Sequence, residues 1–373
     1  MLKRADGETK ARFACLARAR VMADLAALPT EEDDTDRASF LRQLLTGLFA
    51  AALLPGEALE RITGDRLATV DATLVAAHER LSAELAAKHN RADQRVRLPM
   101  VAAYADDVLE LLSQPMTDAH RTRLNLVVAG AQAQAGMTAF NAGRWAVAYH
   151  HLATAVDVAA GSGDPALHAS ALGTFGYLFS SFPRGGRGGD PARALALFDQ
   201  AVEEAAKADG WTRGWLMTWR ADQHVTSGNV KAALTDVDAA DLAFDEGGDR
   251  ARGFWSRATY GYAMEQHLDS VRGVALALTG HDNHADQSFD RVLTRPANIH
   301  RQANTFGHLG LVRARAGALD GASEALLEGL DAAVPAGYAM GVERIRGVRA
   351  QFPEGCASLT CVRDLDERLQ TLH

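Results

Sequence analysis

The feature that most constrains the fold of this chain is a spacing of small and large apolar residues that recurs five times. In each case a small residue is followed four positions later by a large apolar residue, and three positions after that by another small or apolar residue. The five sets are Ala148/Leu152/Ala155, Ala194/Phe198/Ala201, Ala233/Val237/Ala240, Ala285/Phe289/Val292 and Ala322/Leu326/Gly329. Spacings of three and four residues place side chains on one face of an α-helix. The chain therefore predicts five helices that present the same packing face.

A further small residue lies upstream of each set. In four sets it stands twelve residues before the first alanine, as Gly136, Ala221, Gly273 and Gly310. In the second set Gly173 lies 21 residues upstream, and the glycine-rich segment 183–191 explains the difference as an inserted loop. We therefore predict five helix pairs, whose sets follow one another at 46, 39, 52 and 37 residues.

This pattern resembles the tetratricopeptide repeat (TPR), a helix pair of 34 residues with small residues at positions 8 and 27, alanine at 20 and a large apolar residue at 24. The resemblance places Gly310 where the two helices of a pair cross closely, so that a side chain would separate their backbones. Gly329 takes the place of the second small residue. Gly317 and Gly321 lie around the turn between the helices, and Gly307 is expected to leave room in the groove.

The rest of the sequence supports an all-α chain. Strand patterns are nearly absent, and prolines stand at the edges of helical blocks, as in Gly163-Asp164-Pro165. We predict a right-handed α-solenoid of TPR-like helix pairs with additional N-terminal helices and a C-terminal capping helix; the alternative is a generic alanine-rich bundle. The expected parts are a helix and acidic linker over 1–35, a helical region packing on the solenoid over 36–120, and five repeats with capping helices over 121–373. An extra helix is expected at about 250 to 265.

Composition limits the possible partners. A net charge of −8 and a pI near 5.9 argue against a surface that wraps nucleic acid. The three cysteines, Cys15, Cys356 and Cys361, are too few for a disulfide framework and fit a reducing cytoplasm. The most apolar run, 40–56, is shorter than the ~20 residues that span a bilayer and is expected to be a buried helix. We therefore expect a cytoplasmic protein with no membrane segment.

Several segments resemble actinobacterial XRE-family transcriptional regulators with a TPR-like sensor region. The resemblance rests on 135–179, on DPARALALFDQAVEEA (190–205), on VRDLDERLQ (362–370) and on 36–54, which is similar to the segment after the DNA-binding domain. Members of that family usually begin with a helix-turn-helix domain. Here only about 35 residues precede the junction, and they predict one helix, 8–28. A recognition helix needs a scaffold to hold it in the major groove, so direct sequence-specific DNA binding is not expected.

The sequence offers little enzymatic chemistry. The glycines of 185–189 lack the lysine and hydroxyl of a phosphate loop, and His78-Glu79 lacks the second histidine of a zinc protease. The densest cluster of potential metal ligands is 281–286 with Asp290, which is expected to be a polar loop at a helix start. His150 and His151 are expected to face different sides of a helix, so that at most one could join a given site. We predict no metal, no cofactor and, on balance, no enzyme.

A ligand is expected in the concave groove lined by the first helix of each pair. Position 8 of each repeat sets the count along the first helix, and positions 2, 5, 9 and 12 of that helix then face the groove. Residues next to these positions are included as candidates. The candidates are Met137, Phe140, Ser170, Thr174, Tyr177, Trp215, Thr218, Trp219, Asp222, His267, Ser270, Asn304, His308 and Arg315. Aromatic side chains among hydrogen-bonding groups are typical of a small-molecule or peptide pocket, although core packing is the alternative for the two tryptophans.

Three functional hypotheses follow. The first is a regulatory protein that binds a peptide or small molecule in its groove and acts through a partner protein. The second is a constitutive adaptor whose groove holds a segment of another protein. The third is an enzyme with an active site recruited around His267, His308 and Asp222. The apolar run 40–54 and the closing helix 362–372 are plausible surfaces for a homodimer.

Overall fold

The computed structural model describes residues 70–87, 93–180, 189–247, 264–294 and 299–372. The predicted helices 8–28 and 36–54, and nearly all of the helix expected at 250 to 265, lie outside these ranges. Within them the chain forms fourteen α-helices and two short 3-10 turns, with no strand. The all-α prediction is therefore confirmed.

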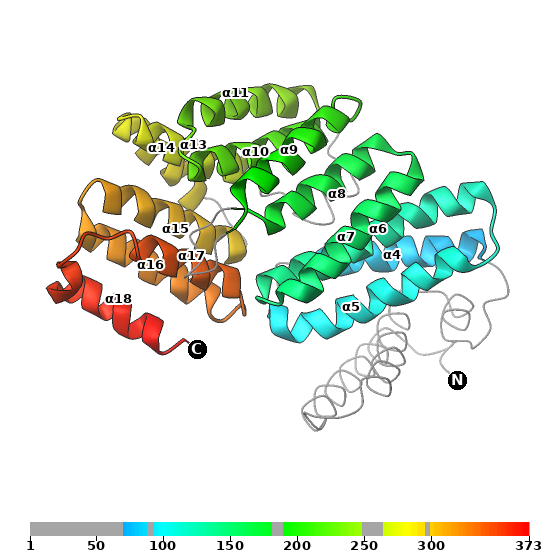
Figure 1. Cartoon of the computed structure of the whole chain (residues 1–373), viewed down its shortest axis with the longest axis horizontal. Coiled ribbons are helices and arrows are strands. Elements are labelled where there is room, and N and C mark those ends of the chain that lie inside the picture. Colours follow the sequence, from blue (N-terminus) through cyan, green and yellow to red (C-terminus); the bar gives the residue numbers. More distant parts are fainter. Residues whose placement is uncertain (1–69, 88–92, 181–188, 248–263, 295–298, 373) are drawn as a thin grey trace, which may run out of the picture.

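The helices form a series of antiparallel pairs, which Figure 1 shows as an arc of stacked layers. The N-terminal helices are α4 (Ala72–Ala87) and α5 (Gln94–Glu110), followed by the 3-10 turn η2 (Leu111–Ser113). The five predicted pairs are α6 (Asp118–Asn141) with α7 (Trp145–Ser162), α8 (Pro165–Leu178) with α9 (Pro191–Ala205), α10 (Gly210–Thr226) with α11 (Val230–Glu246), α13 (Met264–Leu278) with α14 (Asp282–Leu293), and α15 (Ile299–Arg315) with α16 (Leu319–Ala333). Helix α17 (Ala339–Arg349), the turn η4 (Cys356–Ser358) and α18 (Thr360–Gln370) complete the chain.

Local sequence explains where several helices begin. Asp164 and Asp190 accept hydrogen bonds from backbone N–H groups in the first turns of α8 and α9, and Pro165 and Pro191 occupy the first helical positions. Asp209 caps α10 in the same way. Pro99 is an exception to the edge rule, because it lies inside α5, where it removes one backbone donor from the helix.

The position-8 glycines make the close crossings that the repeat pattern predicts. A Cβ atom on Gly136 would lie 2.5 Å from Leu152 Cγ, and one on Gly310 would lie 2.5 Å from Leu326 Cδ2. A Cβ on Gly273 would lie 3.0 Å from the ring of Phe289. In each case the partner is the large apolar residue sixteen positions later. This shared contact confirms the TPR-like pairing in three repeats.

The second pair departs from the predicted register. Gly173 faces the Leu216 side chain of the next pair, whereas Gly176 lies against Leu197, the Ala194 carbonyl and Phe198. The close crossing between α8 and α9 is therefore at Gly176, whereas the sequence pattern predicted it at Gly173. The two glycines are three residues apart, so they lie on neighbouring parts of one helix face and are easily exchanged in a pattern search.

We expect Gly310→Val to lower the free energy of unfolding by about 1–3 kcal/mol, because the new side chain overpacks the contact with Leu326. Urea unfolding followed by circular dichroism measures the change. Gly161→Val is the matched control, since a Cβ atom there meets nothing within 4 Å, and its stability should stay the same or rise slightly. Equal losses in the two variants would argue against a close crossing at Gly310.

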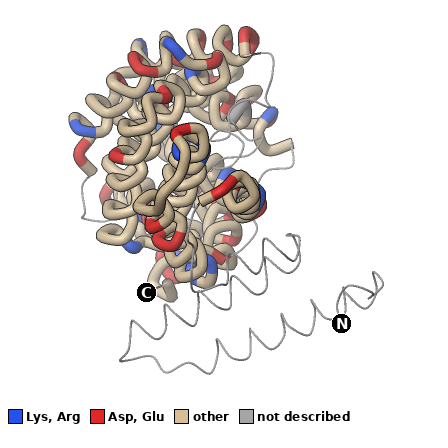
Figure 2. Tube along the Cα trace, turned by 90° about the vertical axis from the view of Figure 1, so that its right-hand side faces the viewer, with Lys and Arg blue, Asp and Glu red and all other residues tan. Residues whose placement is uncertain are grey.

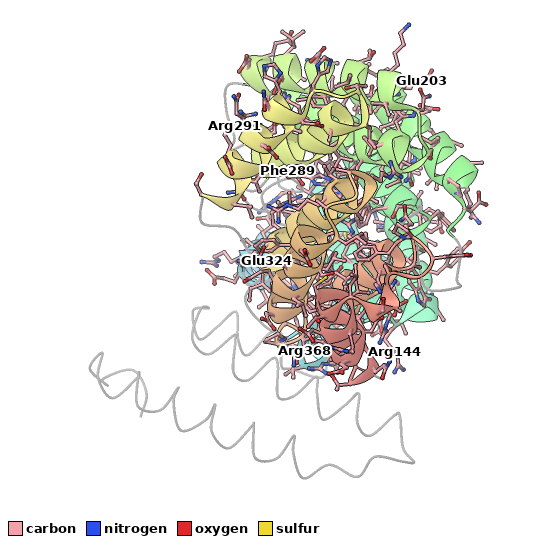
Figure 3. The ribbon with its side chains drawn as sticks, turned by 90° about the vertical axis from the view of Figure 1, so that its left-hand side faces the viewer. Arg144, Glu203, Phe289, Arg291, Glu324 and Arg368 are labelled. Atoms are coloured by element: carbon pink, nitrogen blue, oxygen red, sulfur yellow. The ribbon has the colours of Figure 1, made fainter. Side chains whose placement is uncertain are left out.

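The first helices of the pairs form an inner row, and the second helices lie outside it. Contacts run in series from α6 to α8, α10, α13, α15 and α17, and α17 also contacts α6. The outer helices present charged faces: Arg291 of α14, Glu324 of α16 and Arg368 of α18 are on the surface, whereas Phe289 is buried (Figure 3). Charges of both signs are interspersed along the described trace (Figure 2). None of the described helices combines the length and apolar character that a bilayer span requires.

The two ends of the helix series meet. The Gln94 N–H of α5 donates a hydrogen bond to the Ala336 carbonyl, just before α17, at 3.0 Å. Met137 of α6 and Met340 of α17 belong to the same apolar cluster. The C-terminal helix α18 covers α16 and buries Val362, Leu365 and Leu369, as a capping helix should. The inner row therefore surrounds a common centre to which distant parts of the sequence contribute.

Candidate functional site

The centre of the inner row holds a group of polar side chains that we call the inner polar cluster. Its members come from α8, α10, α13, α15 and α17, including the residue that precedes α17. They are Tyr177, Asp222, His267, Ser270, Arg301, Asn304, His308, Tyr338 and Arg344. None of them is more than 9% exposed. So many polar groups in one buried region are unusual, since burial of polar and charged groups costs free energy unless they are well paired.

Asp222 of α10 lies between two histidines of the cluster. Its Oδ1 is 3.4 Å from Nε2 of His308, and its Oδ2 is 3.8 Å from Nε2 of His267. Burial alone would raise the pKa of the Asp222 carboxyl. The hydrogen-bonding and charge interactions with His308, together with His267 and the Arg344 guanidinium, outweigh burial and hold this pKa well below its usual range. Asp222 is therefore a buried carboxylate that stays ionised at neutral pH.

His308 connects three elements through its two ring nitrogens. Nδ1 lies 2.8 Å from Ser270 Oγ of α13, and Nε2 lies 3.5 Å from Nη1 of Arg344. Nε2 also lies 3.4 Å from Asp222 Oδ1. A guanidinium only donates and a carboxylate only accepts, so Nε2 can pair with Arg344 when it is unprotonated and with Asp222 when it carries the proton. Burial lowers the pKa of His308 and keeps its ring neutral.

Arg344 reaches the cluster because Gly307 leaves space for it. A Cβ atom at Gly307 would lie 3.0 Å from Arg344 Cδ, so a larger residue would require this side chain to shift by a few tenths of an ångström. Arg344 Nη2 also donates to the Tyr177 hydroxyl at 3.5 Å, which links α17 to α8. Gly307 was expected to leave room in the groove, but the Arg344 side chain occupies this space.

His267 of α13 is the least satisfied member of the cluster. Its side chain is 2% exposed, and neither ring nitrogen has a hydrogen-bond partner among the described residues. Burial, reinforced by the positive charge of Arg301, lowers the pKa of His267 well below its ordinary value. A buried neutral imidazole with two unused ring nitrogens is suited to recognise a polar group brought by a ligand.

Aromatic side chains line the cluster on the side of α6, α8 and α10. Tyr177 stacks on Trp219 with ring centroids 4.6 Å apart, and Trp219 packs against Trp215 at 4.9 Å. Phe140 lies 5.4 Å from Tyr177. All four rings are buried in the same apolar cluster as Met137. Tyr338 belongs to the same apolar cluster and donates from its hydroxyl to Asn304 Oδ1 at 2.9 Å.

Thirteen of the fourteen predicted groove residues are buried, and Arg315 is exposed at the last position of α15. The hydroxyls of Thr174 and Thr218 bond to carbonyls four residues earlier in their own helices. Their role is therefore local.

Sequence reasoning missed Arg301, Tyr338 and Arg344. Two of these residues belong to α17 or precede it, and this helix has no second helix with the small–large–small set that marks the five predicted pairs. Gly347 of α17 follows Gly310 by 37 residues, the spacing of the last two sets, and could have indicated a sixth inner helix.

The predicted polar loop at 281–286 is the start of a helix. His281 occupies the cap position of α14 without a side-chain hydrogen bond to the helix, and residues 281–284 are exposed. The ring centroids of His281 and His284 are 6.4 Å apart. Asn283 lies within α14 and does not cap it.

Comparison with known proteins adds a likeness in overall architecture. No protein-family model matches the chain, and neither does any curated protein. Among the similar solved structures is the crystal structure of Rap protein complexed with Competence and Sporulation Factor. The likeness has a TM-score of 0.48 and 15% sequence identity, and it covers 90% of this chain and 86% of that one. The assignment of TPR-like helix pairs rests on the glycine crossings and the helix order of this chain.

Proposed function

We propose that this chain is a TPR-like regulatory protein that binds a peptide or small-molecule signal at the inner polar cluster. The observation that carries the proposal is His267, a fully buried side chain whose ring nitrogens make no hydrogen bond with the described residues. It lies beside the Asp222 carboxylate, at the centre of a cluster built from five inner helices. A ligand group that forms hydrogen bonds with the His267 ring would supply the missing partners of its two nitrogens.

The energetics of burial favour recognition over a purely structural role. Replacing buried ion pairs by apolar residues of similar volume is often neutral or stabilising, so such groups are seldom retained for stability alone. Apolar packing is available to this same row of helices, as the alanines, Met137 and Phe140 of α6 demonstrate. The aromatic rings beside the cluster would supply apolar contact for a ligand, and the polar groups would fix its orientation.

Signalling would follow from the position of the cluster. A ligand held by residues of α8, α10, α13, α15 and α17 would connect the second helix pair to the end of the series, and so change the free energy of opening the whole row. We propose that a partner protein reads this change in the cytoplasm and that the chain does not bind DNA directly. The resemblance to actinobacterial XRE-family sensor regions supports this regulatory role, and a homodimer is compatible with it.

His267→Phe should abolish ligand binding while it preserves the fold. Phenylalanine has a similar shape and the lost ring makes no hydrogen bond, so we expect stability to change by no more than about 1.5 kcal/mol. Native mass spectrometry of protein purified from its own host should show a discrete additional mass on the wild type and none on the variant. His168→Phe, on the flank of α8, is the matched control and should keep the mass.

Two results would contradict the proposal. An additional mass that persists on His267→Phe would place the ligand elsewhere. A wild type that carries no additional mass, but retains the same partner protein as the variant, would favour the constitutive adaptor.

A further inference from the structure

Two histidines of α7 and one aspartate of α5 gather on the outside of the first helix pair. His150, His151 and Asp106 each offer one ligand atom, and these three atoms lie within 4.8 Å of one another. The imidazole centroids are 5.2 Å apart, and the Asp106 carboxylate lies beside the two rings. Among the described residues this is the one such group of three or more. We propose that these residues bind a divalent transition-metal ion of the Zn²⁺ type, independently of the inner polar cluster.

His151 is held in place by a buried amide. Gln132 of α6 donates from Nε2 to the Ala105 carbonyl at 2.8 Å, which fixes the orientation of its amide group. Its Oε1 therefore faces His151 Nδ1, at 2.7 Å, as an acceptor. The hydrogen bond requires a proton on Nδ1 and leaves Nε2 of the neutral ring unprotonated. Metal-binding histidines commonly have this arrangement, in which the nitrogen that does not bind the metal donates to an oxygen.

The accessibility and chemical types of the three residues suit a metal. The His150 side chain and the Asp106 carboxylate are exposed, which gives an ion a path from solvent. Two imidazoles and one carboxylate match the ligand types of zinc sites that keep a fourth position for water. Metal–ligand distances of about 2.0–2.2 Å require the three atoms to move closer, and two of the three side chains are free to rotate at the surface.

The sequence favoured a different cluster. Neighbouring helix positions point about 100° apart, and this geometry led to the prediction that at most one of His150 and His151 could join a site. The different directions are confirmed, since His151 is buried and His150 is exposed. The limit to one histidine is wrong, because the two rings lie close enough for both to join one group with Asp106. The segment 281–286 carries more potential ligands per residue, but no three ligand atoms of its described residues gather in this way.

Isothermal titration of the untagged full chain with Zn²⁺, after removal of bound metal by chelation, tests the proposal. We expect one high-affinity equivalent per chain, and affinity at least tenfold weaker in His150→Ala and in Asp106→Asn. Both substitutions are at exposed side chains, so the fold should survive, and circular dichroism checks this. The double variant His281→Ala/His284→Ala removes an exposed histidine pair elsewhere and should bind Zn²⁺ as the wild type does.

Three outcomes would overturn the proposal: no stoichiometric binding, binding unchanged in both single variants, or loss of binding in the control. The result is separate from the ligand proposal, because His267→Phe should retain the Zn²⁺ site in full. Conversely, His150→Ala should retain whatever ligand the inner polar cluster holds.

Discussion

Asp222→Asn is expected to lower the free energy of unfolding by about 3–5 kcal/mol at pH 7, the range for breaking a buried charge pair by removing one partner. The substitution keeps the shape of the side chain but removes the negative charge that faces His308 at 3.4 Å and His267 at 3.8 Å. It also removes a charge that interacts favourably with the buried Arg344 guanidinium. Urea unfolding measures the loss, and Asp238→Asn, at an exposed position of α11, should change stability by less than about 0.5 kcal/mol.

A double substitution separates electrostatics from packing. If Asp222 stabilises the fold through Arg344, then Asp222→Leu combined with Arg344→Met should lose less stability than the sum of the two single variants. The reason is that replacing both partners by apolar groups of similar volume leaves neither charge of this pair buried without the other. A single-variant loss below about 1 kcal/mol with additive effects would contradict the picture of one coupled cluster.

The sequence was informative about the helix pairs for a physical reason. Close packing of two helices requires a small residue facing a large one at a fixed separation, and Gly136/Leu152, Gly273/Phe289 and Gly310/Leu326 obey this requirement within single pairs. Such contacts span only sixteen residues, so they leave a repeating trace in the chain. The inward-facing positions follow from the same count, which is why the buried His267 and His308 were among the predicted candidates.

The remainder of the cluster depends on contacts without a fixed separation. Arg344 reaches Tyr177 across 167 residues because the ends of the helix series meet, and no repeat pattern encodes that closure. The role of Gly307 illustrates the same limit. Its place beside the groove could be counted from Gly310, but the arginine that fills the space comes from a helix outside the five sets. The convergence of His150 and His151 likewise depends on side-chain directions that helical phase alone does not determine.

Acidification should destabilise the protein well before its carboxylates begin to titrate. Burial lowers the pKa of His78 to about 4, and burial with the charges of Arg301 and Arg97 lowers the pKa of His300 to about 4. An unfolded histidine has a pKa near 6.5, so between pH 6.5 and pH 4 the unfolded chain binds protons that the native chain does not. The free energy of unfolding therefore falls as pH drops through this window, by up to about 3 kcal/mol for each histidine at pH 4, and the loss levels off below that pH.

Urea unfolding at pH 7, 6 and 5 measures the slope while most carboxylates remain ionised. His78→Phe should make the slope shallower, because this ring stacks on Tyr104, its Nδ1 has no hydrogen-bond partner among the described residues, and phenylalanine fills the same space without titrating. His281→Phe, at an exposed position, should leave the slope unchanged. Parallel slopes for the wild type and His78→Phe would mean that His78 gains a proton in the native protein as readily as in the unfolded chain. In that case the burial of this ring would not govern the response of the protein to acid.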